Sequence, residues 1–426
     1  MRLKLLASIL LTAIANSAAM GANLSEIYQL ARANDAEFSS ARAAYTAGLE
    51  KLPQGRALLR PSVNLTGNLR ENDSDSSGLF SSHQYGLSLS QPIYRKQNLE
   101  TYEQAKLLVL QAEQTLKVAE QSLQLRVAQA YFAVLQAQDV LATAQSQKQA
   151  FSEQLAQARK SFEVGASTIT DTHEAQARFD LTTAQEIAAQ NDLEVKRRAL
   201  EQIIASETPE LARLSEAASL SLPEPNNMDA WVKQAESDNL FVALGKTAQE
   251  NARREVGKQK GGHLPTLDLS AGYGGGRNVP TTGNTNSGYI GLDFALPIYQ
   301  GGATASRVRE AVALLEKSRH DLDSARRQAR LDARQSFLGV LSGVAQVKAL
   351  EQALVSSEAQ LKSTKLGLEV GVRTRVDVLN AQQQLFTTKR DLAAARYQTL
   401  LAGLQLKAAA GSLNEEDLKA VDALLK

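Results

Sequence analysis

The histidines of this chain are the side chains best suited to catalysis or metal binding, and there are four of them: His83, His173, His263 and His320. They are scattered along the sequence and show none of the spacings with which histidines ligate a metal. The chain has no cysteine, which excludes disulfides, thiolate metal sites and cysteine nucleophiles together. The glycine run at 274–276 precedes no predicted helix and is therefore not a phosphate loop. We expect no enzymatic activity and no cofactor.

A second group of chemically capable residues follows two Val-Gly turns. The segment FEVGASTITD ends at Asp171, and the segment LEVGVRTRVD contains Arg373 and Arg375 and ends at Asp377. An aspartate and an arginine at a helix junction can form a reversible ionic latch. Each of these charges alone is more often part of a solvated helix surface. The latch hypothesis therefore depends on the elements that hold these residues.

Those elements come in two copies of one unit. LRPSVNLTG at 59–67 returns as HLPTLDLSAG at 263–272, QPIY at 91–94 returns as LPIY at 296–299, and the Val-Gly segments form a third matching pair. The offset between the copies is nearly constant, which separated chance matches would not maintain. We predict a first repeat over 23–205 and a second over 228–411, joined by residues 206–227 and followed by 412–426.

Long helices make up most of each copy. Residues 95–164 contain neither glycine nor proline, so they can run as one helix. Apolar residues from Leu116 to Phe162 recur about every 3.5 positions, the period of a left-handed coiled coil. We predict long helices over 95–164, 168–205, 302–369 and 374–410. Helices of this kind are equally typical of a channel wall and of a coiled-coil tether.

Four short segments alternate apolar and polar residues and are predicted as strands, over 62–70, 84–93, 265–274 and 288–297. Each is about ten residues long, the length that a tilted strand needs to cross a bilayer. Four strands cannot close a barrel, and lipid does not tolerate open strand edges, so several chains would have to contribute strands to one barrel. A soluble sheet of two hairpins packed on helices is the alternative.

The N-terminus predicts export. Arg2 and Lys4 precede an apolar run and then small residues, as in a secretory signal peptide over residues 1–22. After it no window is apolar for long enough to form a spanning helix, so a membrane could be crossed only by strands. Lys and Arg total 47 against 46 Asp and Glu, a balance that argues against nucleic-acid binding.

Specific segments resemble the TolC family of outer-membrane channel-tunnels, which serve efflux and type I secretion. They include LPIYQGG at 296–302, VGVRTRVDVL at 370–379 and GSLNEEDL at 411–418, and the similarity covers essentially the whole mature chain. The resemblance implies a mixed α and transmembrane β fold: a trimeric twelve-stranded β-barrel with four strands per chain, continued by a periplasmic α-helical barrel. Residues 206–227 and 412–426 would form an equatorial belt.

The resemblance also implies a function. The chain would be an exit duct in the outer membrane of a Gram-negative bacterium, extending into the periplasm. Its partners would be two further copies of itself, the outer-membrane lipid, a periplasmic adaptor (membrane fusion) protein and an inner-membrane efflux or ABC transporter. A periplasmic coiled-coil scaffold or tether that forms no pore is the alternative, and the strand pairs favour the duct because a tether has no need of them.

Site residues follow from the same resemblance. Asp377 matches an acidic position at the periplasmic entrance. The family's second acid is Asn380 here, so the entrance would carry three charges instead of six, with weaker cation selectivity. Gly165 and Gly371, at the turns, would contact the adaptor.

The resemblance places a gate latch beside these turns. Thr170, Asp171 and Arg373 match the polar ties that hold the family's entrance closed. Leu368 stands where the family has a latch tyrosine, which removes a hydroxyl partner. Arg375 replaces an apolar residue and could supply another tie.

Overall fold

The computed structural model describes residues 21–75, 78–215, 218–277 and 283–426, so the predicted signal peptide lies almost entirely outside the described residues. The chain divides into two compact units. One contains residues 1–40, 119–239 and 328–426, and the other contains residues 41–118 and 240–327. Each unit draws segments from both sequence copies.

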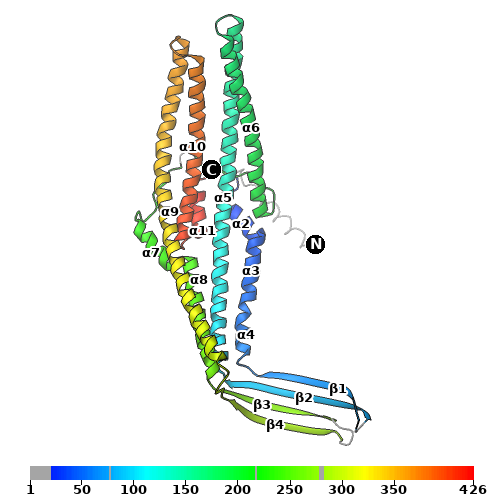
Figure 1. Cartoon of the computed structure of the whole chain (residues 1–426). Coiled ribbons are helices and arrows are strands. Elements are labelled where there is room, and N and C mark those ends of the chain that lie inside the picture. Colours follow the sequence, from blue (N-terminus) through cyan, green and yellow to red (C-terminus); the bar gives the residue numbers. More distant parts are fainter. Residues whose placement is uncertain (1–20, 76–77, 216–217, 278–282) are drawn as a thin grey trace, which may run out of the picture. The chain divides into compact units, whose positions relative to one another are not determined.

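The longest helices are α5 (Lys96–Glu163), α6 (Ile169–Ile204), α9 (Ala303–Glu369) and α10 (Arg375–Ala409), drawn in Figure 1. The 68 residues of α5 contain no glycine or proline, so nothing in its sequence interrupts the backbone hydrogen-bond ladder. Shorter helices are α2 (Leu24–Asn34), α3 (Ala36–Leu49), α4 (Lys51–Ala57), α7 (Met228–Asp238), α8 (Leu240–Lys260), the 3₁₀ turn η1 (Gly261–His263) and α11 (Glu415–Asp422). Among the described residues, none of the helices combines the length and the apolar character required to span a bilayer.

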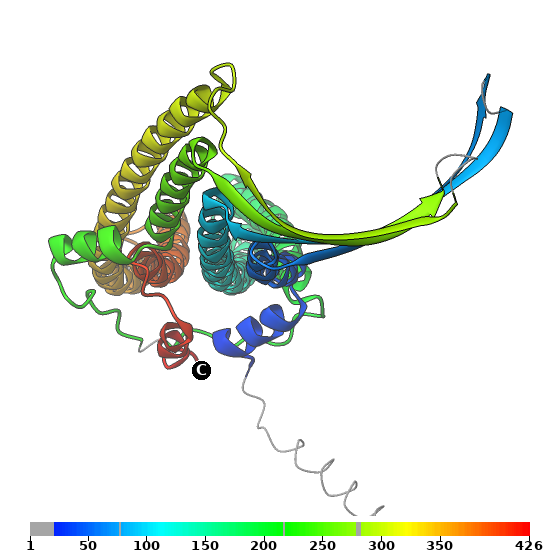
Figure 2. The ribbon, with the colours of Figure 1, turned by 90° about the horizontal axis from the view of Figure 1, so that it is seen from below.

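One antiparallel sheet contains β1 (Ser62–Ser74), β2 (Gly78–Tyr94), β3 (Thr266–Arg277) and β4 (Thr285–Ala295), in that order. Figure 2 shows that the sheet curves along its strands. β1 and β2 extend beyond the predicted strands 62–70 and 84–93, into the largely polar residues 71–74 and 78–83. These residues pair across the hairpin, for example Asn72 with Phe80, because the backbone ladder does not depend on apolar side chains. The glycine run at 274–276 lies inside β3.

The register places most of the apolar residues of the four strands on one face of the sheet, whereas Phe80 and Tyr289 lie on the opposite face. Successive rows across the strands are Tyr94–Leu267–Phe294, Gln91–Leu269–Leu292, Val63–Leu89–Ala271–Ile290 and Leu65–Leu87–Tyr273–Gly288, in which Gln91 is polar. Several of these side chains are strongly exposed, including Leu65 at 79%, Ile290 at 77% and Leu292 at 67%. The opposite face carries polar residues such as Asn64, Ser88 and Ser270. The sheet therefore presents a continuous apolar surface that no described helix of its unit covers.

In the unit that contains residues 119–239 and 328–426, three segments lie side by side: the N-terminal segment, the linker after α6 and the C-terminus. Ala22 forms a parallel bridge with Leu211, and Leu214 forms an antiparallel bridge with Leu425. The buried hydroxyl of Tyr131 donates to the carbonyl oxygens of Ala22 (3.1 Å) and Ala212 (2.8 Å). The two segments that we expected to form a belt, 206–227 and 412–426, are thus in contact within one chain.

A partly buried hydrogen bond also joins α5 to α10. The Tyr397 hydroxyl donates to Asp139 Oδ2 at 2.7 Å. Burial raises the pKa of the Asp139 carboxyl above its usual range, although the Tyr397 hydrogen bond and Arg213 act to lower it. Burial and the Asp139 charge together raise the pKa of Tyr397, which therefore remains a donor. This pair fixes the rotation of α5 relative to α10.

Candidate functional site at the helix tips

Both Val-Gly turns end a long helix in the same way. Gly165 (φ 71°) follows α5, and Gly371 (φ 78°) follows α9. In each case two backbone hydrogen bonds close the turn. After α5, Ala166 N–H donates to Ser161 O and Gly165 N–H donates to Phe162 O. After α9, Val372 N–H donates to Gly367 O and Gly371 N–H donates to Leu368 O. This is the Schellman arrangement, which requires a left-handed residue that glycine adopts without strain. We call residues 161–178 and 366–380 the tip region.

The aspartates after the two turns cap the helices that follow. Asp377 Oδ2 accepts hydrogen bonds from the backbone N–H of Thr374 (2.8 Å) and its hydroxyl (2.9 Å), and the Asp377 N–H donates to Thr374 Oγ1 (3.2 Å). Asp171 and Thr168 form the same reciprocal box at α6. The T-x-x-D spacing in both segments is a sequence signal for this cap. We had assigned these aspartates only a charge role.

The cap affects the charge of Asp377. The Thr374 backbone hydrogen bond, the Thr374 hydroxyl and the nearby Arg373 guanidinium hold the pKa of the Asp377 carboxyl below its usual range. Hydrogen bonds to a carboxylate favour its ionised form. Asp377 therefore stays negatively charged under mildly acidic conditions, as an entrance acid would have to.

Arg375 joins the two sequence copies. Its Nη2 donates to Ser161 Oγ at 2.6 Å, from the start of α10 to the end of α5. Its Nη1 is shielded from solvent and has no hydrogen-bond partner among the described residues. Ser161 was not a predicted site residue, because nothing in its sequence neighbourhood distinguishes it from other helix-surface serines.

A second cross-copy contact involves Asn380. The Arg178 guanidinium on α6 donates to Asn380 Oδ1 at 3.0 Å and also lies 3.9 Å from the Glu174 carboxylate. Asn380, the predicted replacement for an acid, thus receives a hydrogen bond from a cation. A third hydrogen bond joins α5 to α10: Gln147 Nε2 donates to Gln383 Oε1 at 2.5 Å. These three hydrogen bonds and the Tyr397–Asp139 hydrogen bond tie α10 to α5 and α6.

The remaining predicted latch residues are not joined to one another within the chain. Across the residues that the structure describes, no hydrogen bond or ion pair links Asp171 to Arg373. Arg373 packs beside Gly367, where an added Cβ would lie 2.7 Å from Arg373 Cγ. Thr170 is exposed and Leu368 is half-buried. Thr170 and Arg373 thus remain available for contacts with another molecule.

The tip surface is apolar between these polar contacts. Its strongly exposed side chains are Val164 at 78%, Val372 at 76%, Val370 at 65% and Leu366 at 61%. They flank Gly165 and Gly371 on both turns. Apolar side chains grouped in this way on an otherwise polar helix pair are typical of a protein-interaction site.

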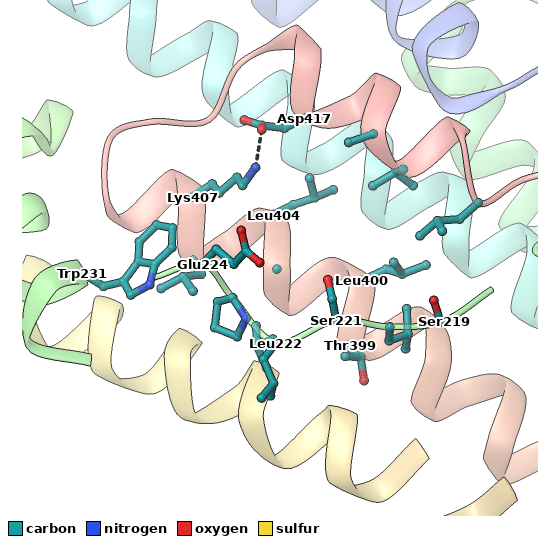
Figure 3. Close-up of a pocket in the computed structure, with 18 residues that line it drawn as sticks. Ser219, Ser221, Leu222, Glu224, Trp231, Thr399, Leu400, Leu404, Lys407 and Asp417 are labelled. Carbon is teal, nitrogen blue, oxygen red and sulfur yellow. Dashed lines mark hydrogen bonds and ion pairs between the residues drawn. The ribbon is translucent and has the colours of Figure 1, made fainter. Parts of the chain in front are cut away.

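One cavity of the described residues lies away from the tip region. It has a volume of about 420 Å³ and is bounded by segment 219–224, by α10 and by α11. Figure 3 shows Glu224 and Leu404 at its centre and the Lys407–Asp417 ion pair at its border. None of the predicted site residues lines it. Among the described residues there is also no group of three or more His, Asp or Glu side chains placed to hold a metal ion.

Comparison with known proteins agrees with this architecture. The sequence model of the family described as "Outer membrane efflux protein" matches residues 27–206 and 231–412, one match to each repeat. The chain is 35% identical over 421 residues to the outer membrane protein TolC of Vibrio cholerae serotype O1, with 96% of this chain and 95% of that protein covered. It is 31% identical over 414 residues to the alkaline protease secretion protein AprF of Pseudomonas aeruginosa, with 93% and 86% covered.

A solved structure, that of the outer membrane protein VceC from Vibrio cholerae, superimposes with a TM-score of 0.79 at 18% identity, covering 91% of this chain and 96% of that one. This match supports the fold alone. Together with the four-stranded sheet and the long helices, it confirms the predicted fold class. The two family matches confirm the resemblance read from the sequence. The chain belongs to the outer membrane efflux protein family.

Proposed function

We propose that this chain is the outer-membrane exit duct of an efflux or type I secretion system and works as a homotrimer. The observation that carries the proposal is the sheet, which has one exposed apolar face and one polar face. An apolar outside and a polar inside are what a barrel wall between lipid and an aqueous lumen requires. Membership of a family of channel proteins favours the duct over a tether and over an enzyme.

The number of copies follows from the sheet edges. Within the described residues β1 pairs only with β2, and β4 pairs only with β3, so the outer edge of each is unpaired. Unpaired backbone groups are not tolerated in lipid, and closed membrane barrels begin at about eight strands. Three copies with four strands each close a twelve-stranded barrel, in which β4 of one copy pairs with β1 of the next. The helices then continue the duct into the periplasm.

The tip region forms the periplasmic entrance in this proposal. Three copies of Asp377 around one axis concentrate negative potential in a narrow mouth and favour cations. Asn380 adds no charge, so the ring holds three carboxylates. Asp171 and Thr170 of one copy face Arg373 of the next and form a latch between copies, whereas Arg375 and Ser161 form a tie within one copy.

The exposed apolar turns around Gly165 and Gly371 are the proposed docking site for the periplasmic adaptor. That adaptor connects the duct to an inner-membrane efflux or ABC transporter.

Reconstitution of the purified protein in planar lipid bilayers tests the proposal. We expect a heat-sensitive trimer on electrophoresis in mild detergent, stepwise ion conductance, and a preference for cations. A monomer that is soluble without detergent and passes no current would support the tether instead. Crosslinking from a photoreactive residue at Val164 or Val372 in intact cells tests adaptor docking. The control is a photoreactive residue at Leu314, near the start of α9 and distant along that helix from its tip end.

A further inference from the structure

Toward the β1–β2 hairpin, polar and basic side chains appear on the apolar face of the sheet. The row after Leu65–Leu87–Tyr273 is Gly67–Tyr85–Gly275–Asn286, and the Tyr85 hydroxyl donates to Asn286 Oδ1 at 2.8 Å. The next row is Leu69–His83–Arg277. Two basic side chains, beside Leu69, therefore lie in the row that follows the aromatic and amide groups.

His83 and Arg277 lie directly opposite each other on β2 and β3. The strands approach closely here: a Cβ at Gly276 would lie 2.0 Å from the His83 carbonyl oxygen, so only glycine fits. Directly opposed residues in a sheet have their Cβ atoms about 5 Å apart. The imidazole and the guanidinium can therefore contact one ligand together.

Arg277 has no acidic partner on this face. No described residue accepts a hydrogen bond from it, and its Nε is shielded without a partner. Glu71 shares the face but lies one row further out and two strands away, about 12 Å by strand spacing. At that separation an exposed charge is largely screened at physiological ionic strength. The guanidinium charge is therefore available to a ligand.

The position of this row matches a membrane boundary. From Leu267 to Gly275 the apolar face runs roughly 27 Å along the strand, comparable with the apolar band of membrane barrels. Aromatic residues such as Tyr85 mark the level of the lipid headgroups, and basic side chains beyond them extend toward the headgroup phosphates. The hairpin end of the sheet is the end remote from the helices, so this boundary belongs to the outer leaflet.

We infer that Arg277 and His83 bind a phosphate group of an outer-leaflet glycolipid, with Tyr85 against its sugar or the start of its acyl chains. A phosphate monoester accepts several charge-assisted hydrogen bonds, which a guanidinium supplies as a fork. The inference rests on the barrel proposed above and adds a lipid site to it. The site is outward-facing and takes no part in transport through the lumen.

The test measures binding of lipid A with two phosphates, and of the same lipid without phosphates, to the trimer in neutral detergent by native mass spectrometry. We expect wild type to prefer the phosphorylated lipid. Arg277→Gln should weaken that binding by about tenfold, the factor expected for one charge-assisted hydrogen bond. Arg277→Lys should retain part of the preference, which separates loss of charge from misfolding.

Arg70→Gln is the matched control. Arg70 is one residue from Leu69 on β1, pairs with Ser82, and lies on the opposite, lumen-facing side of the sheet. Its substitution should leave lipid binding unchanged. An unaltered preference in Arg277→Gln, or an equal loss in Arg70→Gln, would overturn the lipid site. Ion conductance is recorded from the same preparations. If the wild-type protein conducts no ions, the barrel is refuted. If it conducts ions but shows no preference for the phosphorylated lipid, the lipid site alone is refuted.

Discussion

Arg375 at the start of α10 donates a 2.6 Å hydrogen bond to Ser161 at the end of α5, two residues that are 214 positions apart in the sequence. The contact crosses from the second sequence copy to the first. Because it lies within one chain, it can hold α10 against α5 whether or not a neighbouring copy is present.

Substituting Arg375 should loosen the closed entrance. Arg375→Leu removes the tie to Ser161 and is expected to raise the fraction of time that single channels spend open, by roughly tenfold for a charge-assisted hydrogen bond. Arg390→Leu is the control, since Arg390 lies on the same helix but pairs with its neighbour Asp391 on the exposed surface. Ser161→Ala should have a smaller effect and should add nothing to Arg375→Leu. Full additivity would show that the two side chains do not act together.

Arg373 should act between copies. Arg373→Ser is expected to increase open conductance, because it removes the proposed partner of Asp171 on the next subunit. A cysteine pair at 171 and 373 should crosslink copies into dimers and trimers on oxidation and should lower the conductance until it is reduced. Crosslinks confined to single chains, or a conductance that Arg373→Ser leaves unchanged, would contradict this latch.

Asp377 should combine a charge role with a structural one. Asp377→Asn keeps a capping oxygen and removes the charge, so cation preference in bilayer recordings should fall while the apparent Tm stays nearly constant. Thr374→Ala removes the cap at a cost of about 1 kcal/mol and should leave ion selectivity largely intact. Equal selectivity in Asp377→Asn and wild type would remove Asp377 from the entrance.

The pH dependence of the entrance follows from the lowered pKa of Asp377. A carboxyl whose folded pKa is depressed contributes its stabilisation above the unfolded value, about 3.9, and loses it as pH falls through the folded pKa. Cation preference should therefore persist when the pH is lowered from 7 to 4.5. A loss of preference centred above pH 5 would mean that another group sets the selectivity.

Asn380 and Arg178 should be coupled in restoring an acid to the entrance. Asn380→Asp supplies a second carboxylate, but Arg178 lies 3.0 Å from the Asn380 oxygen and would neutralise it. We expect Asn380→Asp alone to increase blockade by multivalent cations only slightly. The double variant Asn380→Asp with Arg178→Ala should increase it strongly. If the single variant already blocked as tightly as the double variant, the Arg178 contact would have no electrostatic role.

The partly buried Asp139–Tyr397 pair should affect stability and not selectivity. Tyr397→Phe removes a hydrogen bond to a partly buried carboxylate and should destabilise the protein by about 1–3 kcal/mol. Because the folded pKa of Asp139 is raised, the free-energy cost of keeping its carboxyl ionised in the folded protein is absent at low pH and grows as pH rises through that pKa. The apparent Tm of Tyr397→Phe should therefore recover toward wild type near pH 4, and a loss independent of pH would contradict the proposed cause. Tyr45→Phe is the control, since the Tyr45 hydroxyl has no hydrogen bond with any described residue.

The sequence predicted the elements well and their contacts poorly. Alternation such as Leu65–Thr66–Gly67 fixes which strand residues share a face, and the absence of glycine and proline between Arg95 and Val164 fixes a long helix. Both are local properties of the chain. The polar ends of β1 and β2 were underestimated because residues such as Asn72 enter the ladder through their backbone, which carries no side-chain signal.

The contacts at the tip region depend on distant partners. Arg375 was singled out from the sequence, but its partner Ser161 depends on the rotation of two long helices about their axes, which a period of 3.5 or 3.6 residues does not fix over such lengths. The same holds for Asn380 and Arg178. The helix caps are different: Thr168–Asp171 and Thr374–Asp377 have a recognisable spacing, and that signal was overlooked.

In the proposed trimer, the unpaired outer edges of the described sheet make folding a reaction between molecules. A single chain can complete its helices and its four strands, but in that trimer the backbone groups along the outer edges of β1 and β4 would find their partners on neighbouring chains. The last step is therefore second or third order in protein, and dilution should slow it and lower the apparent stability. Before assembly the apolar face of the sheet is exposed. The chain is therefore most prone to aggregate between its synthesis and its assembly.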